Sequence, residues 1–110
     1  MTGNLAFISA MELFGYADDA NLTKNALTYV NKVYADLHRI AYPNKEFKPL
    51  ELLIDKLDLP VRMCTIAMPL GVAELIALGR GDGELQQYFA LDYDRAKAKF
   101  NTIDKVHYVI

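Results

Sequence analysis

Residues 61–85, VRMCTIAMPLGVAELIALGRGDGEL, begin as a long apolar run and end in a glycine-rich turn. Only three polar side chains interrupt the run before residue 79, and Pro69 lies inside it. A helix that is apolar around most of its circumference usually lies at the centre of a fold or in an interface. We therefore predict a central helix, which is kinked or restarted at Pro69 because proline lacks a backbone N–H group.

The turn GRGDGEL, residues 79–85, has the glycine content of a phosphate-binding loop but not its chemistry. A loop of the Walker type needs a lysine and a hydroxyl residue after its last glycine, whereas Glu84 follows Gly83 here. Acidic side chains at the start of a helix also repel a phosphate group. The embedded tripeptide Arg-Gly-Asp matches an adhesion motif over three residues only, and no other feature indicates an extracellular protein.

We interpret this turn instead as a corner between two packed helices. Gly79 is predicted to end the first helix with a positive φ, and Gly81 is predicted to permit the reversal of the chain. Asp82 is predicted to cap the N-terminus of the next helix with its carboxylate.

Residues 24–41, upstream of the central helix, give the clearest amphipathic pattern in the chain. Val30, Val33 and Leu37 follow one another at helical spacing, with polar residues on the opposite side. Pro43 is expected to end this helix. Three residues that precede the helix are candidate N-caps: Asp18, Asp19 and Asn21.

Two further segments lie before the central helix. The N-terminal segment predicts a short helix, stopped by Gly15, with an apolar stripe made of Leu5, Ile8, Met11 or Glu12, and Phe14. The segment 46–62 carries leucines at helical spacing between Pro49 and Pro60. It predicts a short helix followed by an extended stretch into Pro60.

After the corner, residues 83–103 predict a further helix whose apolar stripe is Leu85, Tyr88 or Phe89, Asp92 or Tyr93, Ala96 and Phe100. The last residues, DKVHYVI, change period, because Val106, Tyr108 and Ile110 alternate with their neighbours. This alternation predicts an extended arm over residues 104–110. An apolar arm of this length needs a partner, either the stretch around residues 57–59 of its own chain or a neighbouring subunit. We favour the neighbour, so Val106, Tyr108 and Ile110 are the candidate assembly interface.

The predicted elements define an all-α fold: a single helical domain, residues 1–110, built as a small bundle of four or five helices with an extended C-terminal tail. Ten residues on the three clearest stripes are expected to be mostly buried: Val30, Val33, Leu37, Ile66, Leu70, Ala73, Ile76, Leu85, Phe89 and Phe100.

Composition limits the classes of function. A chain of 110 residues has room for one core, and 53% hydrophobic residues argue against disorder. A net charge of −2 gives no support for a strongly basic nucleic-acid surface.

Cys64 lies in an apolar run and is expected to be a small buried residue. No basic region precedes an apolar run at the N-terminus, which argues against a signal peptide, and no apolar window is long enough for a membrane span.

The titratable residues do not form a recognisable catalytic or metal-binding motif. His38 and His107 lack partners at metal-ligand spacing and are expected to be solvated or hydrogen-bonded. Asp92 and Asp94 precede several basic residues, which predicts local ion pairs rather than an acid–base dyad. We therefore predict no enzyme, no catalytic, cofactor-binding or metal-binding residues and no cofactor.

Four motifs give the chain a resemblance to a known family: VNKVYADL at 30–37, LPVR at 59–62, MPLGVAELIALGRGDGE at 68–84 and YFALDYDRAKAKF at 88–100. With its short length, the chain resembles the head–tail connector, or adaptor, proteins of long-tailed bacteriophages and prophages. The resemblance covers most of the chain. None of its motifs is catalytic, so no residue with a fixed role is carried over.

The resemblance implies a non-enzymatic structural subunit that forms a homo-oligomeric ring below the portal during virion assembly. Its partners would be the phage portal and tail-completion proteins, without sequence-specific nucleic acid and without a membrane. It would be found in the cytoplasm of the bacterial host during assembly and then in the virion.

Two other functions stay open at this point. A small helical DNA-binding regulator would need a recognition helix, for which the last helix is the only candidate, with Gln86, Gln87, Arg95, Lys97 and Lys99. A small enzyme is the less favoured alternative, and its sign would be a pocket with titratable groups of shifted pKa.

Overall fold

The computed structural model shows an all-α bundle, as predicted. It describes the backbone of residues 1–14 and 24–109, and side chains for residues 1–13 and 24–100. The α-helices are α1 (Gly3–Phe14), α3 (Ala26–Ala41), α4 (Met68–Gly79) and α5 (Gly83–Val109). A π-helical segment, η1 (Met63–Ala67), directly precedes α4. The candidate N-caps Asp18, Asp19 and Asn21 lie outside the described residues.

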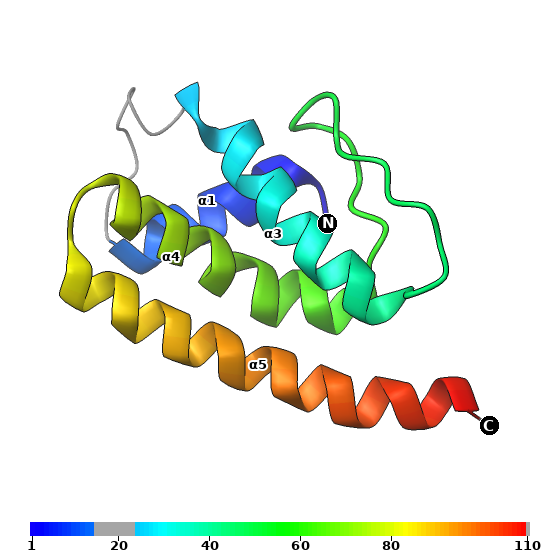
Figure 1. Ribbon diagram of the computed structural model, residues 1–110. Coiled ribbons are helices and arrows are strands. Elements are labelled where there is room, and N and C mark those ends of the chain that lie inside the picture. Colours follow the sequence, from blue (N-terminus) through cyan, green and yellow to red (C-terminus); the bar gives the residue numbers. More distant parts are fainter. Residues whose placement is uncertain (15–23, 110) are drawn as a thin grey trace.

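The apolar helix α4 lies at the centre of the bundle, which confirms its predicted position. It contacts α1 and α3 and packs along α5, which follows it antiparallel after the corner (Figure 1). Val72, Ala73 and Ile76 of α4 are completely buried. Burial on nearly all sides explains why this helix has so few polar residues.

The helical pattern changes directly before Pro69, where the π-helical turn η1 leads without a break into α4. The Met68 N–H donates to the Met63 carbonyl, five residues back, rather than to the usual residue four back. Pro69 then occupies a position near the N-terminus of α4, where a missing N–H leaves no helical bond broken. The Thr65 hydroxyl donates to the Val61 carbonyl at 3.1 Å within the same segment.

The corner after α4 is a helix–helix turn, but its left-handed residue is Gly81, with φ of 73°. The Gly81 N–H donates to the Leu78 carbonyl and the Asp82 N–H to the Ala77 carbonyl, the two bonds of a Schellman motif. The prediction of a positive φ at Gly79 is therefore wrong, because α4 continues through this residue. Asp82 does cap α5, since its Oδ1 accepts from the Leu85 N–H at 3.1 Å.

Gly79 meets a steric requirement instead of a conformational one. A Cβ atom at this position would lie 2.7 Å from the hydroxyl oxygen of Tyr29 on α3. Glycine therefore lets the end of α4 lie close to the side chain of Tyr29.

The predicted stripe of α3 is confirmed, and most of the expected core with it. Val30, Val33, Leu37, Ala73, Ile76, Phe89 and Phe100 are buried. Leu70 and Leu85 are half-buried and pack against this core. Ile66 is 46% exposed, so its assignment to the core is wrong. Its neighbours Cys64 and Ala67 point inward instead, because the π-helical turn shifts the helical phase.

The helix α1 is confirmed, and its buried face agrees with the prediction only in part. Met11 of the predicted stripe is buried together with Ala6, Phe7 and Ala10, whereas Leu5 and Ile8 of that stripe are exposed. Apolar residues occur on both faces of α1, so the sequence pattern did not distinguish the inner face from the outer one. The side chain of Phe14 lies outside the described residues.

The predicted helix within residues 46–62 is wrong, because residues 46–60 belong to an irregular loop between α3 and η1, and only residues 61–62, next to η1, are helical. The loop is held in place by hydrogen bonds to α3 and to the N-terminal segment. The Asn31 side chain on α3 pairs with both backbone groups of Leu50, at 2.7 and 3.0 Å. Lys56 forms an isolated antiparallel bridge with Thr2. Hydrogen bonds to the N-terminal segment thus replace those of a helix.

The predicted extended tail is also wrong for its described backbone, since α5 continues to Val109. The segment after Gly83 contains no glycine or proline that would end the helix. Ile103 and Val106 continue the spacing of Phe100 in steps of three, so the apolar residues fit a helix as well as a strand. The structure has the helical form, because α5 continues through these residues.

Candidate functional site

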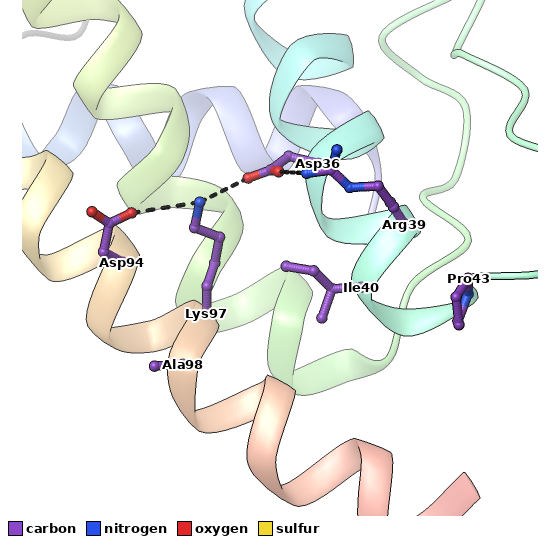
Figure 2. A pocket seen from close by; sticks show the side chains of 7 residues that line it. All are labelled: Asp36, Arg39, Ile40, Pro43, Asp94, Lys97 and Ala98. Atoms are coloured by element: carbon purple, nitrogen blue, oxygen red, sulfur yellow. Dashed lines mark hydrogen bonds and ion pairs between the residues drawn. The ribbon is translucent and has the colours of Figure 1, made fainter.

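An open groove of about 520 Å³ lies between α3 and α5 and is lined by four charged side chains. We call it the α3–α5 groove, and Figure 2 shows the residues that line it: Asp36, Arg39, Ile40, Pro43, Asp94, Lys97 and Ala98. The charged residues come from both helices, so the packing of α3 against α5 creates the site.

Asp36 is the centre of this groove. Its Oδ2 accepts hydrogen bonds from the Tyr93 hydroxyl at 2.8 Å and from Lys97 Nζ at 3.0 Å. Its Oδ1 accepts from Arg39 at 2.8 Å. Lys97 Nζ also lies 3.5 Å from Asp94 Oδ1, and a dashed line marks this ion pair in Figure 2. The charges of Asp36, Arg39, Asp94 and Lys97 are therefore paired with one another.

The pKa values follow from this geometry. Burial alone would raise the pKa of Asp36, but hydrogen bonds from Tyr93 and Lys97 outweigh it and hold the pKa below its usual value. Burial, followed by the bond to ionised Asp36, raises the pKa of the Tyr93 hydroxyl far above its ordinary range. Tyr93 thus stays protonated as a hydrogen-bond donor, which suits a structural link between α3 and α5.

Glu74 on α4 lies beside this cluster, and its pKa is shifted in the direction opposite to that of Asp36. Burial raises the pKa of Glu74, and repulsion from Asp94 raises it further. Glu74 lines a smaller hollow together with Asp36 and Tyr93.

The sequence predicted the local ion pairs but not their connection to α3. Arg95 lies 3.9 Å from Asp92 and Lys97 lies 3.5 Å from Asp94, which confirms the pairs within α5. Asp36 was missed, because it lies on the polar side of the α3 pattern and its partners are about 60 residues away.

A second groove, of about 300 Å³, lies on the other flank of α5, between that helix and η1 with the start of α4. We call it the η1–α5 groove, and it is lined by Arg62, Ile66, Leu70, Asp92, Arg95, Ala96, Lys99 and Phe100. Its apolar lining includes Ile66, which is exposed, and Leu70, which is half-buried. Its charged lining consists of three cationic side chains and one carboxylate, Asp92, which lies 3.9 Å from Arg95, so the groove combines apolar surface with a net positive charge.

His38 and Cys64 take structural positions. His38 is buried rather than solvated, in contact with the rings of Tyr34, Tyr42 and Phe47, with its Nε2 3.6 Å from Asp58. Cys64 is buried, as predicted, and burial raises the pKa of its thiol. Within the described part of the chain, no group of three or more His, Cys, Asp or Glu residues could hold a metal ion.

The predicted assembly residues Val106, Tyr108 and Ile110, like His107, lie outside the described side chains. The candidate DNA-reading residues of α5 differ from one another in pairing and in exposure. Lys97 is paired with Asp36 and Asp94, and Gln86 is half-buried, whereas Gln87, Arg95 and Lys99 are exposed. They do not form one free basic face.

Among the described residues, no helix combines the length and the apolar character needed to cross a membrane. A scan against protein-family models and searches of curated proteins and of solved structures gave no match for this chain. The site is therefore interpreted from its own geometry.

Proposed function

We propose that this protein is a non-enzymatic phage or prophage structural protein, a head–tail connector subunit that forms a homo-oligomeric ring below the portal. Its partners are further copies of itself and the portal and tail-completion proteins. It acts in the host cytoplasm during assembly and then in the virion, without a cofactor.

The observation that supports this proposal is the number of large apolar side chains left exposed by a well-filled core. Leu5, Ile8 and Leu13 are exposed on α1, and Tyr88 and Leu91 are exposed on α5. Exposed apolar surface of this kind typically marks contacts with other proteins. The charges of the α3–α5 groove are paired with one another, which favours a structural role over general acid–base chemistry.

The proposal is tested by deleting the gene from the genome that carries it and inducing the phage. Electron microscopy is expected to show DNA-filled heads and separate tails, with whole virions restored by a plasmid copy. Genes for a portal and a capsid protein are expected beside this one. Normal virions after the deletion, or a neighbourhood without phage genes, would contradict the proposal.

A further inference from the structure

A tight turn in the loop between α3 and η1 presents two large apolar side chains to solvent. Leu52 is 58% exposed and Ile54 is 72% exposed. Glu51 and Asp55 flank this pair, so two carboxylates frame an apolar tip. We call residues 51–55 the apolar turn.

The apolar turn is fixed in shape by hydrogen bonds on both sides. The Asp55 N–H donates to the Leu52 carbonyl at 3.1 Å, and the Asp55 carboxylate accepts from the Leu52 N–H at 2.9 Å. The carbonyls of Leu53 and Asp55 accept from the N–H groups of Asn4 and Gly3. Leu53 itself packs against the core. A preorganised turn loses little conformational freedom when a partner binds it.

The η1–α5 groove has the complementary chemistry. Its apolar lining, with Ile66 exposed, matches the side chains of Leu52 and Ile54. Its charged lining has three cations, Arg62, Arg95 and Lys99, and one carboxylate, Asp92 beside Arg95, so its net positive charge is opposite to that of the two carboxylates of the turn. The loop that carries the turn lies on the opposite side of α3 and α4 from α5 (Figure 1), so a copy's turn does not reach its own groove.

We infer that the apolar turn of one copy docks into the η1–α5 groove of the next copy. Because the two surfaces differ, the contact is head-to-tail, and such contacts close into rings when the rotation between copies permits it. The inference rests on the proposed function, for which it names the contact between subunits.

The test uses two variants of the full chain, each lacking one half of the contact. The turn variant L52K/I54K meets the cationic side chains of the groove with like charge, and the groove variant I66K places a charge in its apolar lining. Because all three residues are exposed, both variants are expected to keep the wild-type circular dichroism spectrum and melting temperature. The matched control is L78K, a substitution of an equally exposed leucine at the α4–α5 corner.

Sedimentation is expected to show assembly of the wild type and of L78K. Each interface variant alone should be monomeric, with self-association weakened at least about tenfold. An equal mixture of the two variants should give a one-to-one dimer, because one intact turn and one intact groove remain and no further copy can be added.

The inference is overturned if either folded variant assembles like the wild type, or if the mixture stays monomeric. A wild type that is monomeric at millimolar concentration also overturns it. These results are separate from the gene deletion, because heads without tails would still support the connector proposal whichever surfaces join the subunits.

Discussion

Asp36 and Glu74 are two carboxyl residues of one cluster whose pKa values are moved in opposite directions. Asp36 receives hydrogen bonds from Tyr93 and Lys97, which favour its ionised form. Burial, followed by repulsion from Asp94, raises the pKa of Glu74, so its neutral form is favoured. At neutral pH the first carboxylate therefore stabilises the contact between α3 and α5, and the second weakens the fold.

The variant Asp36→Asn is expected to lower the free energy of unfolding by about 1–3 kcal/mol at pH 7, because it removes a charged acceptor of three donors. The folded pKa of Asp36 lies below the unfolded value. Its stabilisation is therefore present above the unfolded pKa and is lost as the pH falls through the folded pKa. Urea denaturation should show the difference from wild type shrinking below about pH 4.

Glu74→Gln is the matched variant, and its effect on stability is expected to be opposite to that of Asp36→Asn. Because the folded pKa of Glu74 is raised, its stability contribution is complete below the unfolded pKa and is lost as the pH rises through the folded value. The amide is expected to stabilise the protein by a few tenths of a kcal/mol at pH 7 and to have no effect near pH 3, given the partial exposure of this side chain. Destabilisation by Glu74→Gln at pH 7 would show that the carboxylate is favourably paired.

Gly81→Ala is expected to destabilise the protein by about 1–2 kcal/mol, since an L-residue adopts a φ of 73° at this cost. No atom lies within 4 Å of the position that the new Cβ would take, so the effect would be conformational alone. Gly83→Ala is the control, because its Cβ would also lie in open space and its φ is not positive. Thermal denaturation should leave Gly83→Ala unchanged or slightly stabilised, and equal loss in both variants would argue against the left-handed assignment.

At the scale of elements, residues on similar apolar stripes differ in how deeply they are buried. Leu37 on α3 is completely buried, whereas Ile66 on η1 is 46% exposed, although both lie on predicted apolar stripes. The π-helical turn before Pro69 accounts for the difference, because one additional residue in a turn rotates the following side chains. A regular helical period therefore fails at this segment.

Leu37→Ala is expected to lower the free energy of unfolding by about 2–5 kcal/mol, through lost burial and the cavity that remains. Ile66→Ala is expected to change it by less than about 0.5 kcal/mol, the usual range for surface positions. Chemical denaturation of the two variants side by side measures the contrast. If Ile66→Ala lowered the free energy of unfolding by more than about 1 kcal/mol, Ile66 would belong to the core after all.

At the scale of the whole molecule, α5 packs against three of the other helical segments and also extends past them. It contacts α3, α4 and η1, and both grooves lie along it. Its C-terminal turns run beyond the ends of the other helices (Figure 1). One helix thus contributes to the core and leads out of the domain.

Deletion of residues 104–110 is expected to change the free energy of unfolding by less than about 0.5 kcal/mol, because these turns lie beyond the helices that pack against α5. Self-association or portal binding is expected to fall, since the segment contains the predicted assembly residues Val106, Tyr108 and Ile110. Sedimentation and thermal denaturation of the truncated chain measure the two effects. Unfolding of the body, or assembly equal to that of the full chain, would remove the segment from the assembly interface.

Sequence by itself determined those features that depend on neighbours along the chain. The period of α3, the central position of α4, an irregularity of the helix near Pro69 and the cap at Asp82 were all predicted correctly. Each follows from a local rule: side-chain spacing, a missing N–H group or a carboxylate beside free backbone donors.

Only the tertiary structure decided which faces are buried and which residues meet across helices. The inner face of α1, the loop held by Asn31 and the Asp36–Tyr93–Lys97 cluster depend on partners that are distant in sequence. The same is true of both grooves, whose walls come from separate elements. Such contacts arise when helices pack, because the free energy of burial and pairing depends on the whole arrangement and not on the spacing of residues in one segment.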